Sequence, residues 1–348
     1  MSRAVRRTFL QRRGRAFAVA GATLFAACSW GRRDEPPPPP PPEEPAEAPR
    51  PAIPPEREEP PPRPRPEPAP ARRDTARPPP PSGTEALPGA ILPRERIVAF
   101  YGNPRSPRMG ILGELPPEQM LARLDREVAA WERADPDTPV RPALHMIAVM
   151  ATGDPGPDSL YRLRMPRRAI EDVMSWAERR DALVFLDIQA GKSTVAAELR
   201  HLLPWLRHPE VHLALDPEWR MTDGGIPGKR IGTMRAAEVN HAIRELARLV
   251  AEEGLPPKVL VVHRFTRHML PDAHEVEDDP RVQVVLNMDG WGPPQNKINT
   301  YRVHVSPAPI PFKGFKLFYR NDRWNGSRMM EPEEVLALTP EPIYIQYQ

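Results

Sequence analysis

Two carboxylates and a tryptophan follow a short apolar run beyond the middle of the chain. The segment 211–219 reads Val-His-Leu-Ala-Leu-Asp-Pro-Glu-Trp and places Asp216 and Glu218 two residues apart. Alternate residues of a strand share a face, so these carboxylates are expected on the same side, and Pro217 between them is typical of a strand end. Two acidic groups at the mouth of a buried strand could form an acid/base pair. The alternative is that Asp216 caps the following loop and Glu218 is solvated.

Polar and aromatic side chains also follow the other apolar runs of the chain. They are Tyr101, Asn103, Asp187, Gln189, His263, Arg264, Asp289, Trp291, Tyr319 and Gln346. Carboxylates ringed by aromatic residues are typical of sugar-binding clefts, where flat rings such as Trp219 and Trp291 stack on the sugar. Taken singly, these residues have structural explanations: Asp187 could cap a helix, and His263 could be a satisfied core histidine.

Apolar runs alternate with helical patterns from residue 94 to residue 348. Strands are expected at 97–101, 145–150, 183–188, 211–215, 259–263, 282–287, 315–319 and 343–345. Helices are expected at 115–133, 167–180, 194–205, 234–253 and 332–338. Eight strands, most followed by a helix, over roughly 250 residues predict an α/β fold, a closed (β/α)₈ TIM-type barrel. The alternative is an open doubly wound sheet, but no glycine-rich turn follows the first strand.

In a barrel of this kind, the residues that follow the strands meet at one end. There the segment 215–219, Leu-Asp-Pro-Glu-Trp, resembles the D-x-E motif of chitinase-type glycoside hydrolases, and it is similar to the D-x-E of a muramidase family with a related barrel. The resemblance implies that Glu218 protonates the glycosidic oxygen and that Asp216 orients the substrate or tunes the acid. Asn-Met-Asp at 287–289 is loosely similar to the chitinase Met-x-Tyr-Asp, which implies that Asp289 faces the same site.

The leading hypothesis is therefore a glycoside hydrolase acting on a glycan or peptidoglycan-type substrate, without a cofactor or metal ion. The expected catalytic residues are Glu218, Asp216 and Asp289. The expected substrate-binding residues are Tyr101, Asp187, Gln189, Trp219, His263, Trp291 and Tyr319.

Two other functions stay open. The longer chitinase pattern D-x-x-D-x-D-x-E is not met, since Val211 and Ala214 occupy its earlier aspartate positions. This departure favours a barrel that binds glycan, or serves as a structural envelope lipoprotein, without catalysis. A metal-dependent hydrolase or deacetylase is the third hypothesis, in which His263 would combine with an aspartate such as Asp187, Asp216 or Asp289. The histidines of 263–274 lack the spacing of a paired zinc motif.

Residues 1–28 are typical of an export signal, with a basic part followed by an apolar part. Arg-Arg-Thr-Phe-Leu at 6–10 resembles the twin-arginine motif, and Phe-Ala-Ala-Cys at 25–28 resembles a lipoprotein cleavage box. Cys28, the only cysteine of the chain, is expected to carry the lipid. The protein is thus expected outside the cytoplasm as a membrane-anchored lipoprotein of the cell envelope, periplasmic or at the cell surface. The alternative is an uncleaved signal anchor.

Residues 29–93 are rich in proline and predict a disordered, polyproline-like stalk before the barrel domain of residues 94–348. At about 3.1 Å per residue such a spacer could reach on the order of 100 Å. The alternative role is a proline-rich ligand for a partner module. The net charge of +3 is small, and no basic stretch interleaved with aromatics occurs in the folded part, so no nucleic-acid partner is expected.

Overall fold

The computed structural model describes residues 87–348. The predicted signal segment, Cys28 and most of the predicted stalk lie outside the described residues, and what the sequence predicts for them stays a prediction. None of the helices in residues 87–348 is both long and apolar enough to cross a membrane.

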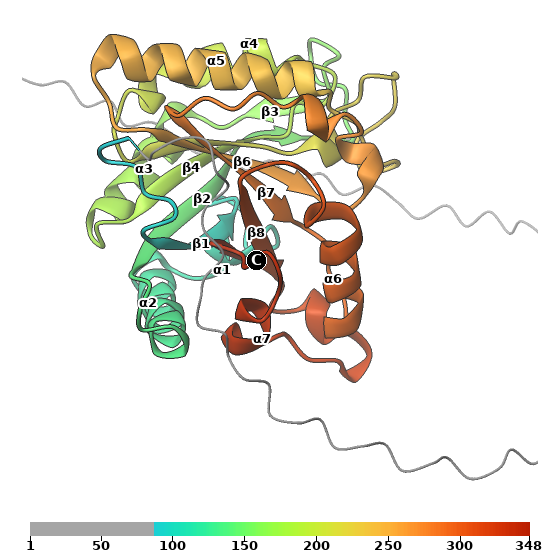
Figure 1. The fold of residues 1–348 in the computed structure, drawn as a ribbon. Helices are drawn as coiled ribbons and strands as arrows, with labels where there is room; N and C mark the ends of the chain where they lie inside the picture. Colours follow the sequence, from blue (N-terminus) through green and yellow to red (C-terminus); the bar gives the residue numbers. More distant parts are fainter. Residues whose placement is uncertain (1–86) are drawn as a thin grey trace, which may run out of the picture. The chain divides into compact units, whose positions relative to one another are not determined.

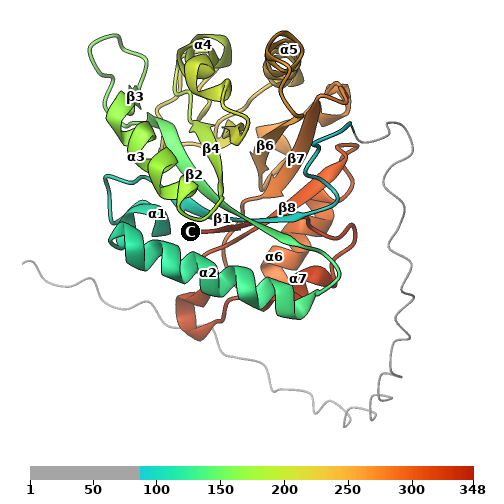
Figure 2. The same ribbon diagram turned by 90° about the vertical axis from the view of Figure 1, so that its left-hand side faces the viewer.

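Eight parallel strands close into a barrel (Figures 1 and 2). They are β1 (Arg96–Gly102), β2 (Val140–Ala151), β4 (Leu183–Ile188), β5 (Val211–Leu215), β6 (Lys258–Arg264), β7 (Val282–Met288), β8 (Phe312–Leu317) and β9 (Tyr344–Tyr347). Each pairs with the next along the chain, and β9 pairs with β1, which closes the cylinder. A short strand, β3 (Arg162–Arg164), runs antiparallel to the end of β2. The predicted (β/α)₈ barrel is confirmed.

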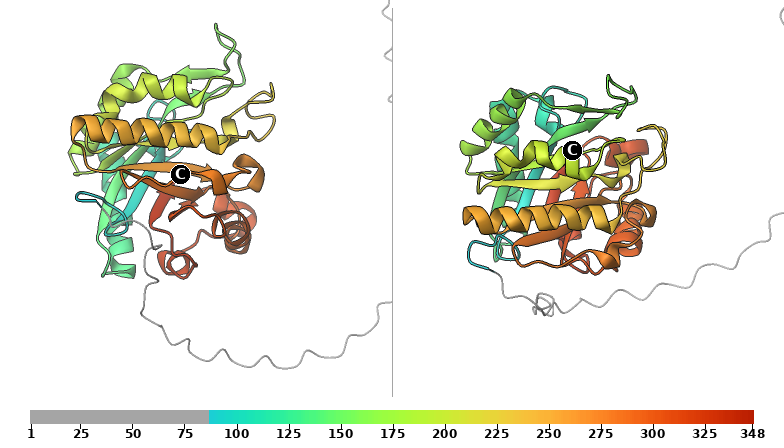
Figure 3. Two further views of the ribbon diagram at one scale, coloured as in Figure 1. Left: turned by 45° about the horizontal axis from the view of Figure 1, so that its top comes forward. Right: turned by 90° about the horizontal axis from the view of Figure 1, so that it is seen from above.

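Helices cover the outside of the barrel, and α4 and α5 lie side by side on it (Figure 3). The helices are α1 (Ile111–Glu114), α2 (Pro117–Ala134), α3 (Arg167–Glu178), α4 (Val195–Leu206), α5 (Ala236–Glu253), α6 (Pro294–Thr300) and α7 (Pro332–Leu336). Short helical turns are η1 (Pro217–Trp219), η2 (Arg267–Met269), η3 (Ala273–Glu275), η4 (Tyr301–Val305) and η5 (Asn321–Gly326). The sequence pattern did not predict α6, because Pro-Gln-Asn-Lys-Ile-Asn-Thr holds a single large apolar residue and shows no helical periodicity.

Strand alternation gives the barrel wall an inner and an outer face. The outer residues pack against the helices, whereas the inner residues form a separate apolar cluster that includes Ala143, Phe185, Val261 and Val285. Two residues further along each of these four strands, the inner position is polar. These polar residues are His145, Asp187, His263 and Asn287. The barrel interior is therefore mainly apolar toward the amino-terminal ends of the strands, with His212 and Gln283 as exceptions, and polar toward their carboxyl-terminal ends.

The segment before β1 closes the amino-terminal end of the barrel. Leu92 is fully buried and belongs to the inner apolar cluster. The side chain of Gln283, at the start of β7, accepts from the backbone N–H of Leu92 over 3.0 Å and donates to its carbonyl over 2.5 Å. The packed domain thus includes residues that precede position 94, and the chain enters the barrel at the end opposite to the polar side chains.

Candidate active site

A pocket of about 450 Å³ opens at the carboxyl-terminal end of the barrel. The predicted site residues that line it are Tyr101, Gln189, Asp216, Glu218, Trp219, Asp289 and Trp291. They come from β1 and from the segments that follow β4, β5 and β7, as the barrel topology requires. Arg108, Phe265, Lys316 and Phe318 also line the pocket, and the sequence pattern did not single them out.

Asp216 and Glu218 are held by the short turn η1 that follows β5. The Oδ1 atom of Asp216 accepts from the backbone N–H of Glu218 over 3.2 Å, and its Oδ2 atom accepts from the side chain of Gln189 over 3.4 Å. Asp216 therefore caps the turn, as its structural explanation requires, and lines the pocket as well. Burial raises the pKa of Asp216 well above its usual range.

The carboxyl group of Glu218 faces the pocket without a partner: no hydrogen bond or ion pair joins it to any of the described residues. Burial, and then the nearby charge of Asp289, raise the pKa of Glu218 to about 7. Such a group holds a proton near neutral pH and can release it, which is the requirement for a general acid.

Asp289, just after β7, is held in a very different environment. Its Oδ1 atom forms an ion pair with Nζ of Lys316 at 2.9 Å, and its Oδ2 atom lies 3.1 Å from Nδ1 of His263. Burial favours the neutral acid, but Lys316 and then His263 outweigh it and lower the pKa of Asp289 to about 2. Asp289 is thus a carboxylate in the same pocket as the protonatable Glu218.

Tyr101 and Lys316 complete the polar wall of the pocket. The Lys316 ammonium lies 3.7 Å from the centre of the Tyr101 ring, and the Tyr101 hydroxyl accepts from Gln189 over 3.2 Å. Burial, followed by the surrounding carboxylates, raises the pKa of Tyr101 well above its usual range, so the phenol stays neutral and can donate a hydrogen bond. Lys316 was missed because the sequence pattern placed the seventh strand at 315–319, whereas β8 spans Phe312–Leu317 and points Lys316 inward.

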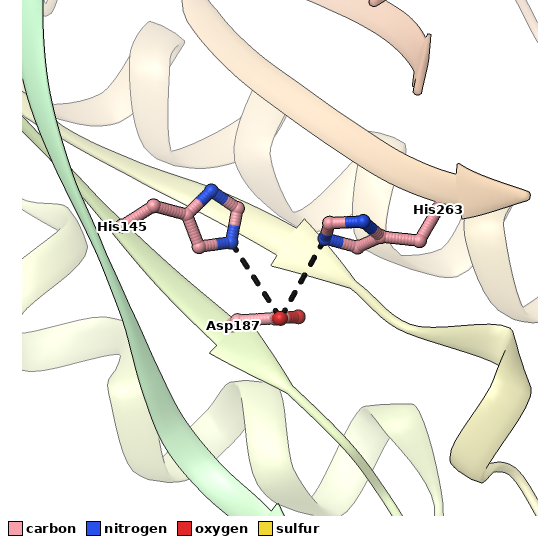
Figure 4. Close-up of side chains that lie close together, drawn as sticks. All are labelled: His145, Asp187 and His263. Atoms are coloured by element: carbon pink, nitrogen blue, oxygen red, sulfur yellow. Dashed lines mark ion pairs between the residues drawn. The ribbon is translucent and has the colours of Figure 1, made fainter. Parts of the chain in front are cut away.

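Asp187 and His263 lie in a layer that does not line the pocket. Both are fully buried, and together with His145 they form a compact group inside the barrel (Figure 4). Burial lowers the pKa of His145 to about 4, whereas the aspartates around His263 outweigh burial and raise its pKa. His145 was missed because it lies within an apolar run, and only the closure of the barrel shows that its side chain faces inward.

Tyr319 lies away from the pocket. Its hydroxyl donates to Glu127 over 2.8 Å, its ring stacks on Tyr347 with centroids 5.2 Å apart, and the Arg123 guanidinium lies 3.7 Å from its ring centre. Because β8 ends before position 319, this side chain packs under helix α2 and is not carried to the barrel mouth. Of the predicted aromatic residues, Trp219 and Trp291 do reach the pocket.

The pocket therefore offers a protonatable glutamate, an ionised aspartate and two indole rings in one cavity. Pairs of carboxyl groups whose environments push their pKa values apart are the arrangement of acid and base in many hydrolases. No protein-family model matches the chain, and no curated protein is similar to it.

Proposed function

We propose that the protein is a glycoside hydrolase of the cell envelope, exported and held at the membrane by a lipid on Cys28. The observation that carries this proposal is the free carboxyl group of Glu218 in a pocket that also holds the Asp289–Lys316 ion pair and two tryptophans. The size of the pocket, about 450 Å³, is that of a ligand site.

In this proposal Glu218 donates its proton to the glycosidic oxygen as the bond to the leaving sugar breaks. The oxygen of a water molecule then bonds to the anomeric carbon, and the water releases a proton that replaces the one donated by Glu218. Asp216 supports it by fixing the turn that carries Glu218, through the hydrogen bond to its backbone N–H. The carboxylate of Asp289 stabilises the positive charge that develops on the sugar ring. Trp219 and Trp291 provide flat apolar surfaces for pyranose rings, with Trp291 58% exposed at the rim.

Replacement of the proposed acid tests the function. Turnover of glycan oligomers, including fragments of chitin and peptidoglycan, is measured with the full chain and with Glu218→Gln. We expect turnover by the variant to fall by about 10²–10⁴-fold, because the proton donor is lost, while glycan binding persists. Glu252→Gln, on the exposed face of α5, is the matched control and should keep full turnover.

Two results would contradict the proposal. Unchanged turnover by Glu218→Gln would remove Glu218 as the acid. Saturable binding of glycan by the wild type, with no product and no effect of Glu218→Gln, would instead identify a glycan-binding envelope lipoprotein.

A further inference from the structure

Three buried side chains from three strands converge inside the barrel, beneath the pocket. They are His145 of β2, Asp187 of β4 and His263 of β6, and each is fully buried. Figure 4 shows the two imidazole rings on either side of the carboxylate, each turning a nitrogen toward it. The Nε2 atoms of His145 and His263 lie 3.5 and 3.6 Å from Oδ2 of Asp187.

The atoms that face one another in this cluster make no hydrogen bonds. The two Nε2 atoms and both carboxylate oxygens of Asp187 are buried, and none has a hydrogen-bond partner within residues 87–348. Buried polar atoms in folded proteins almost always have such partners. Four buried polar atoms without a hydrogen bond in one place therefore indicate a missing positive centre.

The hydrogen-bond partners of the two Nδ1 atoms determine whether each Nε2 atom, which faces Asp187, carries a proton or a lone pair. Nδ1 of His263 lies 3.1 Å from the Asp289 carboxylate, which only accepts, and 3.3 Å from the amide nitrogen of Asn287. The shorter contact places the proton on Nδ1, and His263 in its neutral form then turns the lone pair of Nε2 inward. Nδ1 of His145 lies 2.6 Å from the Tyr344 hydroxyl and 2.9 Å from the amide nitrogen of Gln346. An amide nitrogen only donates, so an ion at Nε2 requires the Gln346 amide to turn its oxygen toward Nδ1, which then carries the proton. A metal-binding histidine is typically fixed in this way, by a hydrogen bond from its other nitrogen.

Direct ion pairs between the two histidines and Asp187 do not explain the distances between their atoms. A protonated imidazole that donates to a carboxylate closes to about 2.7–2.9 Å, whereas both contacts to Asp187 are at least 3.5 Å. An ion bound about 2.0–2.1 Å from each donor, with tetrahedral angles, separates neighbouring donors by about 3.4 Å. Both contacts to Asp187 are close to this value, and the donor atoms of the three residues all lie within 4.8 Å of one another.

We infer that His145, Asp187 and His263 bind a divalent transition-metal ion such as Zn²⁺. Two imidazoles and one carboxylate are zinc-type ligands, whereas Ca²⁺ and Mg²⁺ require shells of oxygen atoms. The site goes beyond the proposed glycosidase chemistry, because none of its three ligands lines the pocket. The ion neutralises Asp187 and fixes the ring of His263, which in turn holds Asp289 at the pocket wall.

Metal titration tests the inference without any substrate. The untagged full chain is stripped with a chelator and titrated with Co²⁺, whose visible absorption reports low-coordinate nitrogen and oxygen ligation, and then with Zn²⁺ as competitor. We expect one ion per chain, displacement of Co²⁺ by Zn²⁺, and at least 100-fold weaker binding by Asp187→Asn and by His263→Asn. His212→Asn, which replaces another buried histidine inside the barrel, is the matched control and should bind as the wild type does.

The outcome is independent of the proposed function. Glu218→Gln should bind the metal normally, so loss of turnover and loss of the ion are separate results. If the ligand variants do not fold, the wild type still decides the question, because a ligand of the native state raises the thermal midpoint as its concentration increases. The inference is overturned if Zn²⁺ leaves that midpoint unchanged, if no stoichiometric Co²⁺ binding occurs, or if folded Asp187→Asn binds as tightly as the wild type.

Discussion

Glu218 and Asp289 show how one pocket can keep one carboxyl group protonated and another ionised. Glu218 has no cationic partner in contact, so burial and the charge of Asp289 favour its neutral form. Asp289 lies against Lys316 at 2.9 Å, and this ion pair outweighs the cost of burial. Both side chains carry the same carboxyl group, and only their contacts differ. Because of this difference, one is protonated and the other is ionised near neutral pH.

Glu218→Gln is expected to stabilise the fold at high pH. The pKa of Glu218 rises from an ordinary value of 4.5 to about 7 in the folded chain. Between these values the folded chain holds a proton that the unfolded chain has lost, so wild-type stability falls as pH rises through this window and stays lower above it. Glutamine does not ionise, and between pH 5 and pH 8 the variant should gain about 1–3 kcal/mol over the wild type.

Urea unfolding of both proteins at the two pH values measures this gain. The comparison needs no substrate, and it isolates Glu218 because the other titrating groups are shared. If the difference in unfolding free energy between the two proteins did not change with pH, Glu218 would titrate in the folded chain as it does in the unfolded one.

The sequence could predict the residues that follow strands, but not those that face inward within them. Asp216, Glu218 and Asp289 interrupt apolar runs, and this is why they stood out. His145 and Lys316 lie inside runs that read as buried strand, where a polar residue has no visible partner. Their role depends on residues from other strands that only the closed barrel brings together.

At the scale of elements, the turn η1 is positioned by the later segment that contains Gly232. The backbone N–H of Gly232 donates to the carbonyl oxygen of Glu218 over 2.6 Å. A Cβ atom on Gly232 would lie 2.5 Å from the carbonyl oxygen of Arg220 and 2.6 Å from that of Glu218. These oxygens belong to the backbone, so the turn must move if a side chain is added.

Gly232→Ala is therefore expected to lower turnover by about tenfold or more while the barrel stays folded. A shift of the turn displaces the Glu218 carboxyl group, and catalysis is sensitive to displacements of about 1 Å. Turnover and far-UV circular dichroism are measured together. Gly153→Ala is the control, since a Cβ atom there meets nothing within 4 Å. Full turnover by Gly232→Ala would show that this close approach does not position Glu218.

The periodicity of apolar residues predicted most helices well but missed the bounds of one strand. Helices α2, α3, α4, α5 and α7 were predicted within a few residues, and the first four have an apolar stripe that faces the barrel. The boundary of β8 was missed by three residues at its start, since Phe-Lys-Gly-Phe-Lys-Leu alternates lysines and a glycine with apolar residues. That shift is why Tyr319 was expected in the site and Lys316 was not.

In the whole molecule, the residues that stabilise the barrel and the residues of the proposed site lie toward opposite ends of the barrel axis. The amino-terminal part of the interior is filled mainly by apolar residues, including Leu92, which closes the base. The polar layers lie toward the carboxyl-terminal ends of the strands, where the pocket opens. Buried parallel strands read as plain apolar runs, so the sequence predicted their number but not which inner positions are polar.

The predicted lipid anchor at Cys28 can be removed by a single substitution. The chain enters the barrel at its base, through Leu92 and its hydrogen bonds to Gln283, and the pocket opens at the other end. The described part of the chain therefore begins at the end of the barrel opposite to the pocket. Cys28→Ala should move the protein from the membrane fraction to the soluble fraction of the envelope, because the lipid can no longer be attached. Turnover per molecule should be unchanged, because the described residues that line the pocket all lie between positions 101 and 348.

Cell fractionation with quantitative blotting, followed by turnover measurements on both fractions, checks both parts of this prediction. Ser29→Ala, next to the cysteine, is the control and should remain in the membrane fraction. An uncleaved signal anchor would hold the Cys28→Ala variant in the membrane just as it holds the wild type, and this result would remove the lipid from the proposal. Release from the membrane with a loss of turnover would instead mean that anchoring acts on the site itself.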